Sequence, residues 1–229
     1  MKTIFLIIFI FFSSQTLAHQ PKLIKYSPSI NNPHQVNLPE ISKAYYGKLE
    51  GEPHYYKIES ESEFSFYAGI STPKVSDNYK WFSIEVLDQN HNVIFSGDGK
   101  DYQWKAWYEP YARDWYWIGP QIGIHNDKEF KSSLKMNKGI YLIKVFNQDN
   151  IGHYSLAVGE KEFFGSNMLE KIFTWTPIIF YIGPYMDTVH WQKFDLRAYI
   201  PHIILLIIFF IIYMIIKKIF LRKKNTLNN

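Results

Sequence analysis

Apolar and polar residues alternate along much of the middle of this chain. In "WFSIEVLD" the apolar residues Phe82, Ile84 and Val86 are separated by single polar ones, and "HYSLAV" (153–158) repeats the pattern. A period of two is typical of strands with one buried face. The segment "GIYLIKVF" (139–146) is apolar on both registers and predicts a central strand covered on both faces. Further strands are expected at 44–49, 54–59, 63–68, 92–96 and 129–136.

Turn residues separate these expected strands. Gly, Asn, Asp and Pro cluster at 50–53, 88–90, 97–99, 137–139 and 147–150, where tight turns need their backbone preferences. Eight or nine short strands at this spacing predict an all-β domain, a β-sandwich or jelly roll. The chain has no cysteine, so the domain must be stable without disulfides, and about 180 residues bury enough apolar surface for that.

Two longer hydrophobic blocks lie near the ends of the chain. Residues 1–18 combine a basic start, an apolar run and small residues before His19, which predicts a secretory signal peptide. Residues 198–216 contain no charge and are long enough for a transmembrane helix. Five cations and no acid follow in the tail 217–229, which favours a cytoplasmic tail. The expected protein is a single-pass cell-membrane protein with its N-terminal domain outside, periplasmic or extracellular.

The charge balance depends on these end segments. The chain has a formal net charge of +4. Without Lys2 and the five tail cations, 19 Lys and Arg remain against 21 Asp and Glu. The exported part is therefore slightly acidic, and the basic face that nucleic-acid binding requires is not expected.

Short glycine motifs carry a family resemblance. "YYGKLEGEPHYYKI" (45–58), "GIYLIKV" (139–145) and "GHYSLAV" (152–158) resemble the hallmarks of pre-peptidase C-terminal-type β-sandwiches. The resemblance covers roughly residues 44–160 and implies an exported accessory module without an active site of its own. The preceding residues 19–43 are expected to be an extended segment. This chain differs from that family pattern in its predicted anchor and in an aromatic-rich insertion.

The insertion contains four of the seven tryptophans, and eight of the sixteen residues in 102–117 are aromatic. Its alternation is poor, so we expect a long connection with one irregular strand. The rings could cap an open end of the sandwich, or form an exposed patch that binds a protein partner or a glycan. The candidate binding residues are Trp104, Trp107, Tyr108, Glu109, Tyr111, Arg113, Asp114, Trp115 and Trp117.

Two other chemistries are alternatives. Glu109 and Asp114 could be the paired carboxylates of a glycosidase, although acids in aromatic loops commonly pair with a neighbouring Arg, here Arg113. Signal-peptide cleavage would make His19 the mature N-terminus, where its α-amine and ring nitrogen could chelate copper. The remaining histidines show no paired spacing that preassembles a metal site. No nucleophile motif or phosphate-binding loop is present.

An apolar stalk, residues 161–197, connects the expected sandwich to the expected anchor. Its segment 168–191 is interrupted by Pro177, Gly183 and Pro184, so it should not span a bilayer by itself. It is expected to lie on the membrane, to pack against the sandwich, or to contact a partner's transmembrane helices. The sequence thus predicts a membrane-anchored binding or assembly module rather than an enzyme, with a copper-binding or redox protein as the alternative.

Overall fold

The computed structural model describes residues 19–75, 81–109, 114–123, 134–163, 186 and 200–227 of the 229-residue chain. The chain divides into two compact units, residues 1–189 and residues 190–229. The expected signal peptide (1–18) and all but Met186 of the segment 168–191 lie outside the described residues.

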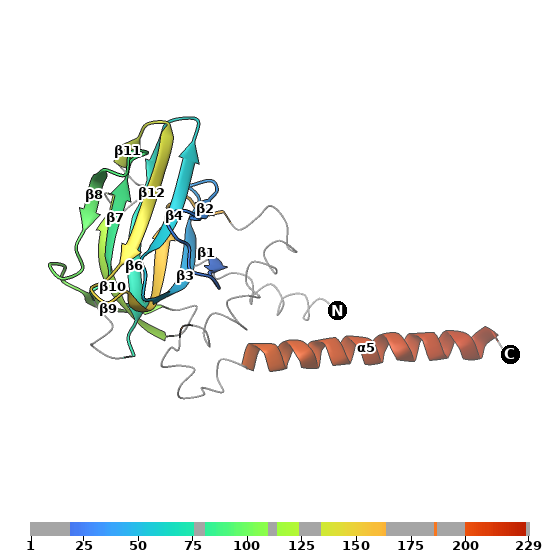
Figure 1. Ribbon diagram of the computed structural model, residues 1–229. Coiled ribbons are helices and arrows are strands. Elements are labelled where there is room, and N and C mark those ends of the chain that lie inside the picture. The colour runs from blue at the N-terminus through green and yellow to red at the C-terminus, as the bar shows by residue number, and fades with distance from the viewer. Residues whose placement is uncertain are drawn as a thin grey trace. The chain divides into compact units, whose positions relative to one another are not determined.

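The first unit is built from strands, thirteen of them in its described part (Figure 1). They are β1 (Gln20–Leu23), β2 (His34–Val36), β3 (Lys43–Glu50), β4 (His54–Ser60), β5 (Phe64–Phe66), β6 (Ala68–Pro73), β7 (Ser83–Leu87), β8 (Val93–Gly97), β9 (Lys105–Glu109), β10 (Asp114–Ile122), β11 (Leu134–Met136), β12 (Gly139–Phe146) and β13 (Ile151–Val158).

Two large sheets form the layers of a sandwich. One has six strands in the order β1-β3-β13-β6-β10-β9, and the other has five in the order β2-β4-β12-β7-β8. A two-stranded ladder joins β11 to β5. The short strands β1 and β2 pair in parallel with β3 and β4, and every other pairing between these strands is antiparallel. The expected all-β sandwich class is therefore confirmed, with more strands than the eight or nine predicted.

In the two alternating segments, the apolar side chains that the period of two selects are buried. Phe82, Ile84 and Val86 in and beside β7 are fully buried, as are Tyr154, Leu156 and Val158 in β13. These side chains belong to one hydrophobic core cluster that draws on both large sheets. β12 lies inside the five-stranded sheet between β4 and β7, as predicted. The expected coverage of both faces is wrong, because Ile140 is exposed and Lys144 and Phe146 are only partly buried.

A polar network lies inside this core. His54 Nδ1 is 2.7 Å from the Tyr154 hydroxyl, which is 2.6 Å from the Tyr56 hydroxyl. All three side chains are at most 1% exposed. The Tyr154 phenol lies over Gly47 on the neighbouring strand β3, where an added Cβ would lie 2.5 Å from its oxygen. Gly47 is therefore needed for the close approach of the Tyr154 ring.

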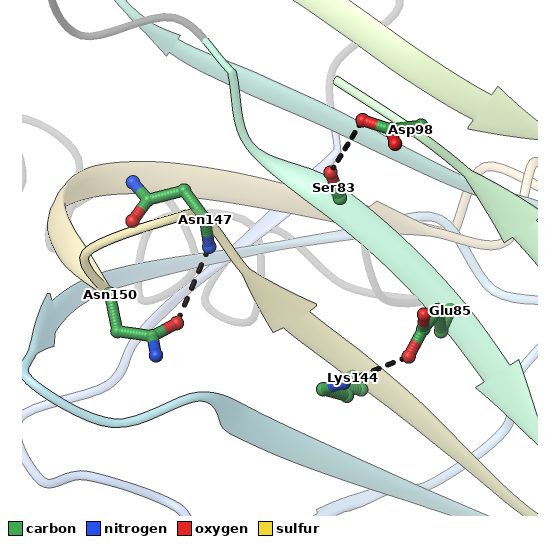
Figure 2. Close-up of polar contacts among 6 residues, drawn as sticks. All are labelled: Ser83, Glu85, Asp98, Lys144, Asn147 and Asn150. Carbon is green, nitrogen blue, oxygen red and sulfur yellow. Dashed lines mark hydrogen bonds and ion pairs between the residues drawn. The ribbon is translucent and has the colours of Figure 1, made fainter. Parts of the chain in front are cut away.

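Polar contacts tie β7 to its surroundings (Figure 2). Lys144 Nζ on β12 is 2.9 Å from Glu85 Oε2 on β7. The Ser83 hydroxyl lies 3.4 Å from Asp98 Oδ1 and accepts a hydrogen bond from the Gly99 amide at 2.9 Å. Ser83 therefore fixes the start of the connection that leads from β8 to β9.

Two predicted elements differ from the observed ones. The strand expected at 63–68 is divided into β5 and the start of β6. The expectation of a long connection with one irregular strand at 102–117 is wrong, because β9 and β10 form a regular antiparallel hairpin there. Aromatic residues occupy both faces of this hairpin, so the apolar and polar alternation that would reveal strands is lost.

The second unit contains the helix α5 (Ile200–Leu227). The side chains described are those of residues 203–218, and the apolar ones from Ile203 to Ile216 are all exposed. Within the described part of the chain, no helical stretch is long and apolar enough to cross a membrane.

Candidate binding surface on the β9–β10 hairpin

The hairpin forms one edge of the six-stranded sheet. β9 pairs with β10 over five residues, with Lys105 opposite Ile118, Trp107 opposite Tyr116 and Glu109 opposite Asp114. β10 in turn pairs with β6. The candidate residues Tyr111 and Arg113 lie in the hairpin connection, outside the described residues.

The pairing of β10 with β6 determines which way the backbone N–H and C=O groups of the hairpin point. The Lys74 amide donates to the Trp115 carbonyl at 2.8 Å, so the backbone groups of Trp115 point toward β6. The next residue, Tyr116, lies opposite Pro73, which has no amide hydrogen. Because backbone polar groups alternate between the two sides of a strand, those of Tyr116 point toward Trp107 on β9. The polar backbone groups of Ala106 and Tyr108 therefore point to the outer edge of β9.

One face of the hairpin carries an aromatic surface, which we define as Tyr108, Trp115, Trp117 and Lys74. The Tyr108 and Trp115 side chains are 43% and 47% exposed, and their ring centroids lie 5.5 Å apart at 61°. Lys74 Nζ lies 4.7 Å from the Trp117 ring centroid and 5.6 Å from that of Trp115. An ammonium at these distances is attracted to the ring faces.

The other face carries Trp107, which is 44% exposed, beside the buried Tyr116. Tyr116 packs in a small cluster with Leu23, Tyr46 and the fully buried Met186. Burial raises the pKa of the Tyr116 phenol well above its ordinary value, and nearby negative charge raises it further. The phenol therefore stays protonated. Met186, from the expected stalk, thus contacts the sandwich.

Glu109 and Asp114 are brought directly opposite each other at the end of the hairpin. Asp114 is buried and accepts a hydrogen bond from the Trp115 amide at 2.8 Å, and both carboxylates make further interactions. The negative charge of Glu109 also contributes to the raised pKa of Tyr46, after the larger effect of burial. A glycosidase role for this pair remains a prediction.

Trp104 lies apart from the aromatic surface and packs against the core. Its Nε1 donates to the Gly99 carbonyl at 2.7 Å, and its ring occupies the space where Gly119 would carry a Cβ. The two interpretations of the aromatic insertion therefore apply to different residues. Trp104 packs against the core, as a capping ring would, whereas Tyr108 and Trp115 are exposed on the aromatic surface and Trp107 is exposed on the opposite face of the hairpin.

Sequence reasoning missed two residues at this end of the sandwich. Lys74 lies far from Trp117 in sequence, and only the β6–β10 pairing brings them together. Trp81 is 46% exposed and adopts a φ of 84°, with its backbone next to Gly99. A positive φ is uncommon for a bulky residue, and no sequence pattern signals it.

The candidate copper ligand His19 lies just before β1, and its Nδ1 contacts the Ser42 hydroxyl. Among the residues that the structure covers, no group of three or more His, Cys, Asp or Glu side chains is arranged to hold a metal ion. A copper site that uses the α-amine of His19 remains a prediction.

These observations define a β-sandwich protein with an exposed aromatic edge hairpin. No protein-family model matches the chain, and no curated protein matches it. Among solved structures, it is similar to the pre-peptidase C-terminal domain of a collagenase from Bacillus anthracis, at 11% identity and a TM-score of 0.31. The match covers 63% of this chain and 98% of that domain. It is a weak structural resemblance to the family that the glycine motifs indicated, and it carries no argument about function.

Proposed function

We propose that this chain is a membrane-anchored, exported binding or assembly module that is not an enzyme. In this proposal residues 1–18 direct export, residues 198–216 anchor the chain, and the basic tail stays in the cytoplasm. The uncharged run followed by five cations supports that orientation. The sandwich then lies outside the cytoplasmic membrane, where it can reach a partner.

The observation that carries the binding role is the exposure of three large rings on one edge hairpin. Trp107, Tyr108 and Trp115 are each between 43% and 47% exposed. Trp and Tyr are the residues that most often dominate binding energy at protein interfaces. Their position on an edge hairpin leaves them accessible to a partner.

Lys74 favours a protein partner over a glycan. Its ammonium lies over the rings of Trp115 and Trp117, so a sugar stacking on that side would have to displace a favourable cation–π contact. A protein partner can instead use the exposed ring edges together with the Lys74 charge.

Site-specific photo-crosslinking of the full-length protein in its own cells tests this function. A benzophenone amino acid replaces Trp115 or, as the matched control, Leu38, which is 70% exposed in the loop before β3. We expect protein adducts from position 115 and few from position 38. Adducts with no protein, together with protease-resistant binding to isolated cell-wall polysaccharide, would contradict a protein partner.

Alanine variants supply the energetic test. Replacing Trp107 and Trp115 by Ala should weaken adduct formation from a probe at Tyr108 at least about tenfold, because exposed interface rings are typical hot spots. The melting temperature should change little, because both side chains are nearly half exposed. A fall of many degrees would instead assign these rings to the core.

A further inference from the structure

β9 differs from the other edges of the two large sheets. In general, edge strands are protected by shortness, by bulges or by charges. β1 and β2 have four and three residues, and the β8 ladder carries a register shift. β9 has five residues in continuous register with β10, its residues 105–108 are exposed, and its two charges, Lys105 and Glu109, lie only at its ends. No described strand pairs with its outer side.

We propose that two copies of this chain associate through β9, as antiparallel strands with the two-fold axis at Trp107. The inference rests on the proposed binding function, since it names a second copy as the partner of the hairpin. The register follows from the outward backbone groups of Ala106 and Tyr108. In antiparallel pairing about Trp107, each Ala106 faces Tyr108 of the second copy, and the two residues exchange both backbone hydrogen bonds.

The side chains of β9 are self-complementary in this register. Lys105 lies opposite Glu109 of the second copy at both ends of the shared ladder, and opposite charges across strands are favourable. On the aromatic-surface face, the small Ala106 leaves room for Tyr108 of the second copy. On the other face, the two Trp107 rings meet at the axis, flanked by the Tyr116 residues that already neighbour them.

These features favour a second copy over an unrelated extended peptide. The sequence "KAWYE" (105–109) places a cation and an anion at equal distances from Trp107. Two-fold symmetry therefore places each cation opposite an anion of the second copy, as a self-complementary interface requires. An unrelated peptide would need its own acid and base at the same spacing.

Cysteine cross-linking tests the register in the full-length protein in its membrane. The chain has no native cysteine, so Trp107→Cys introduces a single thiol that faces its own copy across a non-hydrogen-bonded pair. That separation, about 4.5 Å between Cα atoms, suits a disulfide. Oxidation with diamide should convert most of the Trp107→Cys protein to a disulfide dimer. A yield no higher than that of Leu38→Cys overturns the proposal.

Two further cysteine variants distinguish this register from nonspecific collisions between two copies. Ala106→Cys and Tyr108→Cys should each cross-link poorly alone, because neither faces its own copy. Expressed together, they should cross-link at least about fivefold more, because residue 106 faces residue 108. Equal yields from the separate and mixed variants would overturn the two-fold register.

Charge exchange supplies a test without cysteine, which remains valid if Trp107→Cys fails to fold. Lys105→Glu or Glu109→Lys alone should weaken dimer formation, measured by single-molecule photobleaching in membranes, at least about tenfold. The double variant should restore it, since it recreates both opposite-charge pairs in reverse. Double-variant dimerisation as weak as that of either single variant overturns the proposal.

The crosslinking results separate this inference from the proposed function. Adducts from position 115 with a different protein, combined with no Trp107→Cys dimer, would leave the binding function standing and remove the β9 dimer. Adducts between two copies would support both. Absence of all protein adducts from position 115 would remove the proposed protein-binding function itself.

Discussion

At the scale of single residues, His54 gives the clearest prediction. Burial lowers the pKa of its imidazole to about 4, an effect that the nearby charge of Glu50 partly opposes. Because the folded pKa lies below the ordinary value of 6.5, the unfolded state binds the proton first as the pH falls. The contribution of His54 to the free energy of unfolding is therefore largest above pH 6.5, and it is lost as the pH falls toward 4. The limiting slope is about 1.4 kcal/mol per pH unit.

Urea unfolding of the full-length protein in detergent micelles, measured at several pH values, checks this expectation. His54→Gln should flatten the pH dependence between 6.5 and 4, because the titrating group is removed from the core. His91→Gln is the matched control, since His91 is exposed in the turn before β8. An unchanged slope in His54→Gln would show that another group is responsible.

At the scale of elements, the aromatic hairpin and the connection before it should respond differently to substitution. Trp104→Ala should lower the free energy of unfolding by about 2–4 kcal/mol, because it opens space above Gly119 and removes the bond to the Gly99 carbonyl. Trp115→Ala should cost less than about 1 kcal/mol, because its ring is 47% exposed. The same urea measurement checks both. Equal losses would contradict the separation of a structural tryptophan from exposed ones.

Elements with one buried face were the predictable ones. β7 and β13 contain the alternating runs 82–86 and 154–158, and the apolar residues that the alternation selects there are buried, whereas Ile151 at the start of β13 is exposed. β9 and β10 escaped prediction because Trp107 and Tyr108 are adjacent, as are Trp115, Tyr116 and Trp117. Consecutive rings give no period, and their sorting onto two faces is visible only once the strands are paired. β1 and β2 are too short to show a periodic pattern. Their extended conformation depends instead on parallel pairing with β3 and β4.

At the scale of the whole molecule, the sequence indicated the β-sandwich class but not the contacts that assemble the candidate surface. Lys74 reaches Trp117 because β6 pairs with β10 in the six-stranded sheet. Sheet order depends on pairings between distant segments, which local periodicity does not encode. The exposure of Trp107 and the burial of Trp104 likewise follow from that order, because the neighbouring strands and connections determine which rings are covered.

The membrane topology of the full chain can be measured with single cysteines, because there is no native thiol to label. Ile151 is 61% exposed at the start of β13, whereas Lys223 lies in the basic tail. With the sandwich outside, Ile151→Cys should react with a membrane-impermeant maleimide in intact spheroplasts, and Lys223→Cys should react only after permeabilisation. The proposed orientation rests on the positive charge after the expected span, which favours a cytoplasmic tail. Labelling of Lys223→Cys in intact spheroplasts, with protection of Ile151→Cys, would reverse the proposed orientation.

Replacing the tail cations tests whether their charge, rather than the insertion of the apolar helix by itself, determines the orientation of the chain. Substitution of Lys217, Lys218, Arg222, Lys223 and Lys224 by Gln removes the charge bias while leaving the apolar run 198–216 unchanged. In a chain that also lacks residues 1–18, this substitution should abolish the uniform orientation, because the positive flank is then the main determinant of which end stays in the cytoplasm. With the segment 1–18 in place, translocation of the sandwich should persist. A mixed population in this second case would show that the tail charges, rather than the predicted signal peptide, direct the sandwich across the membrane.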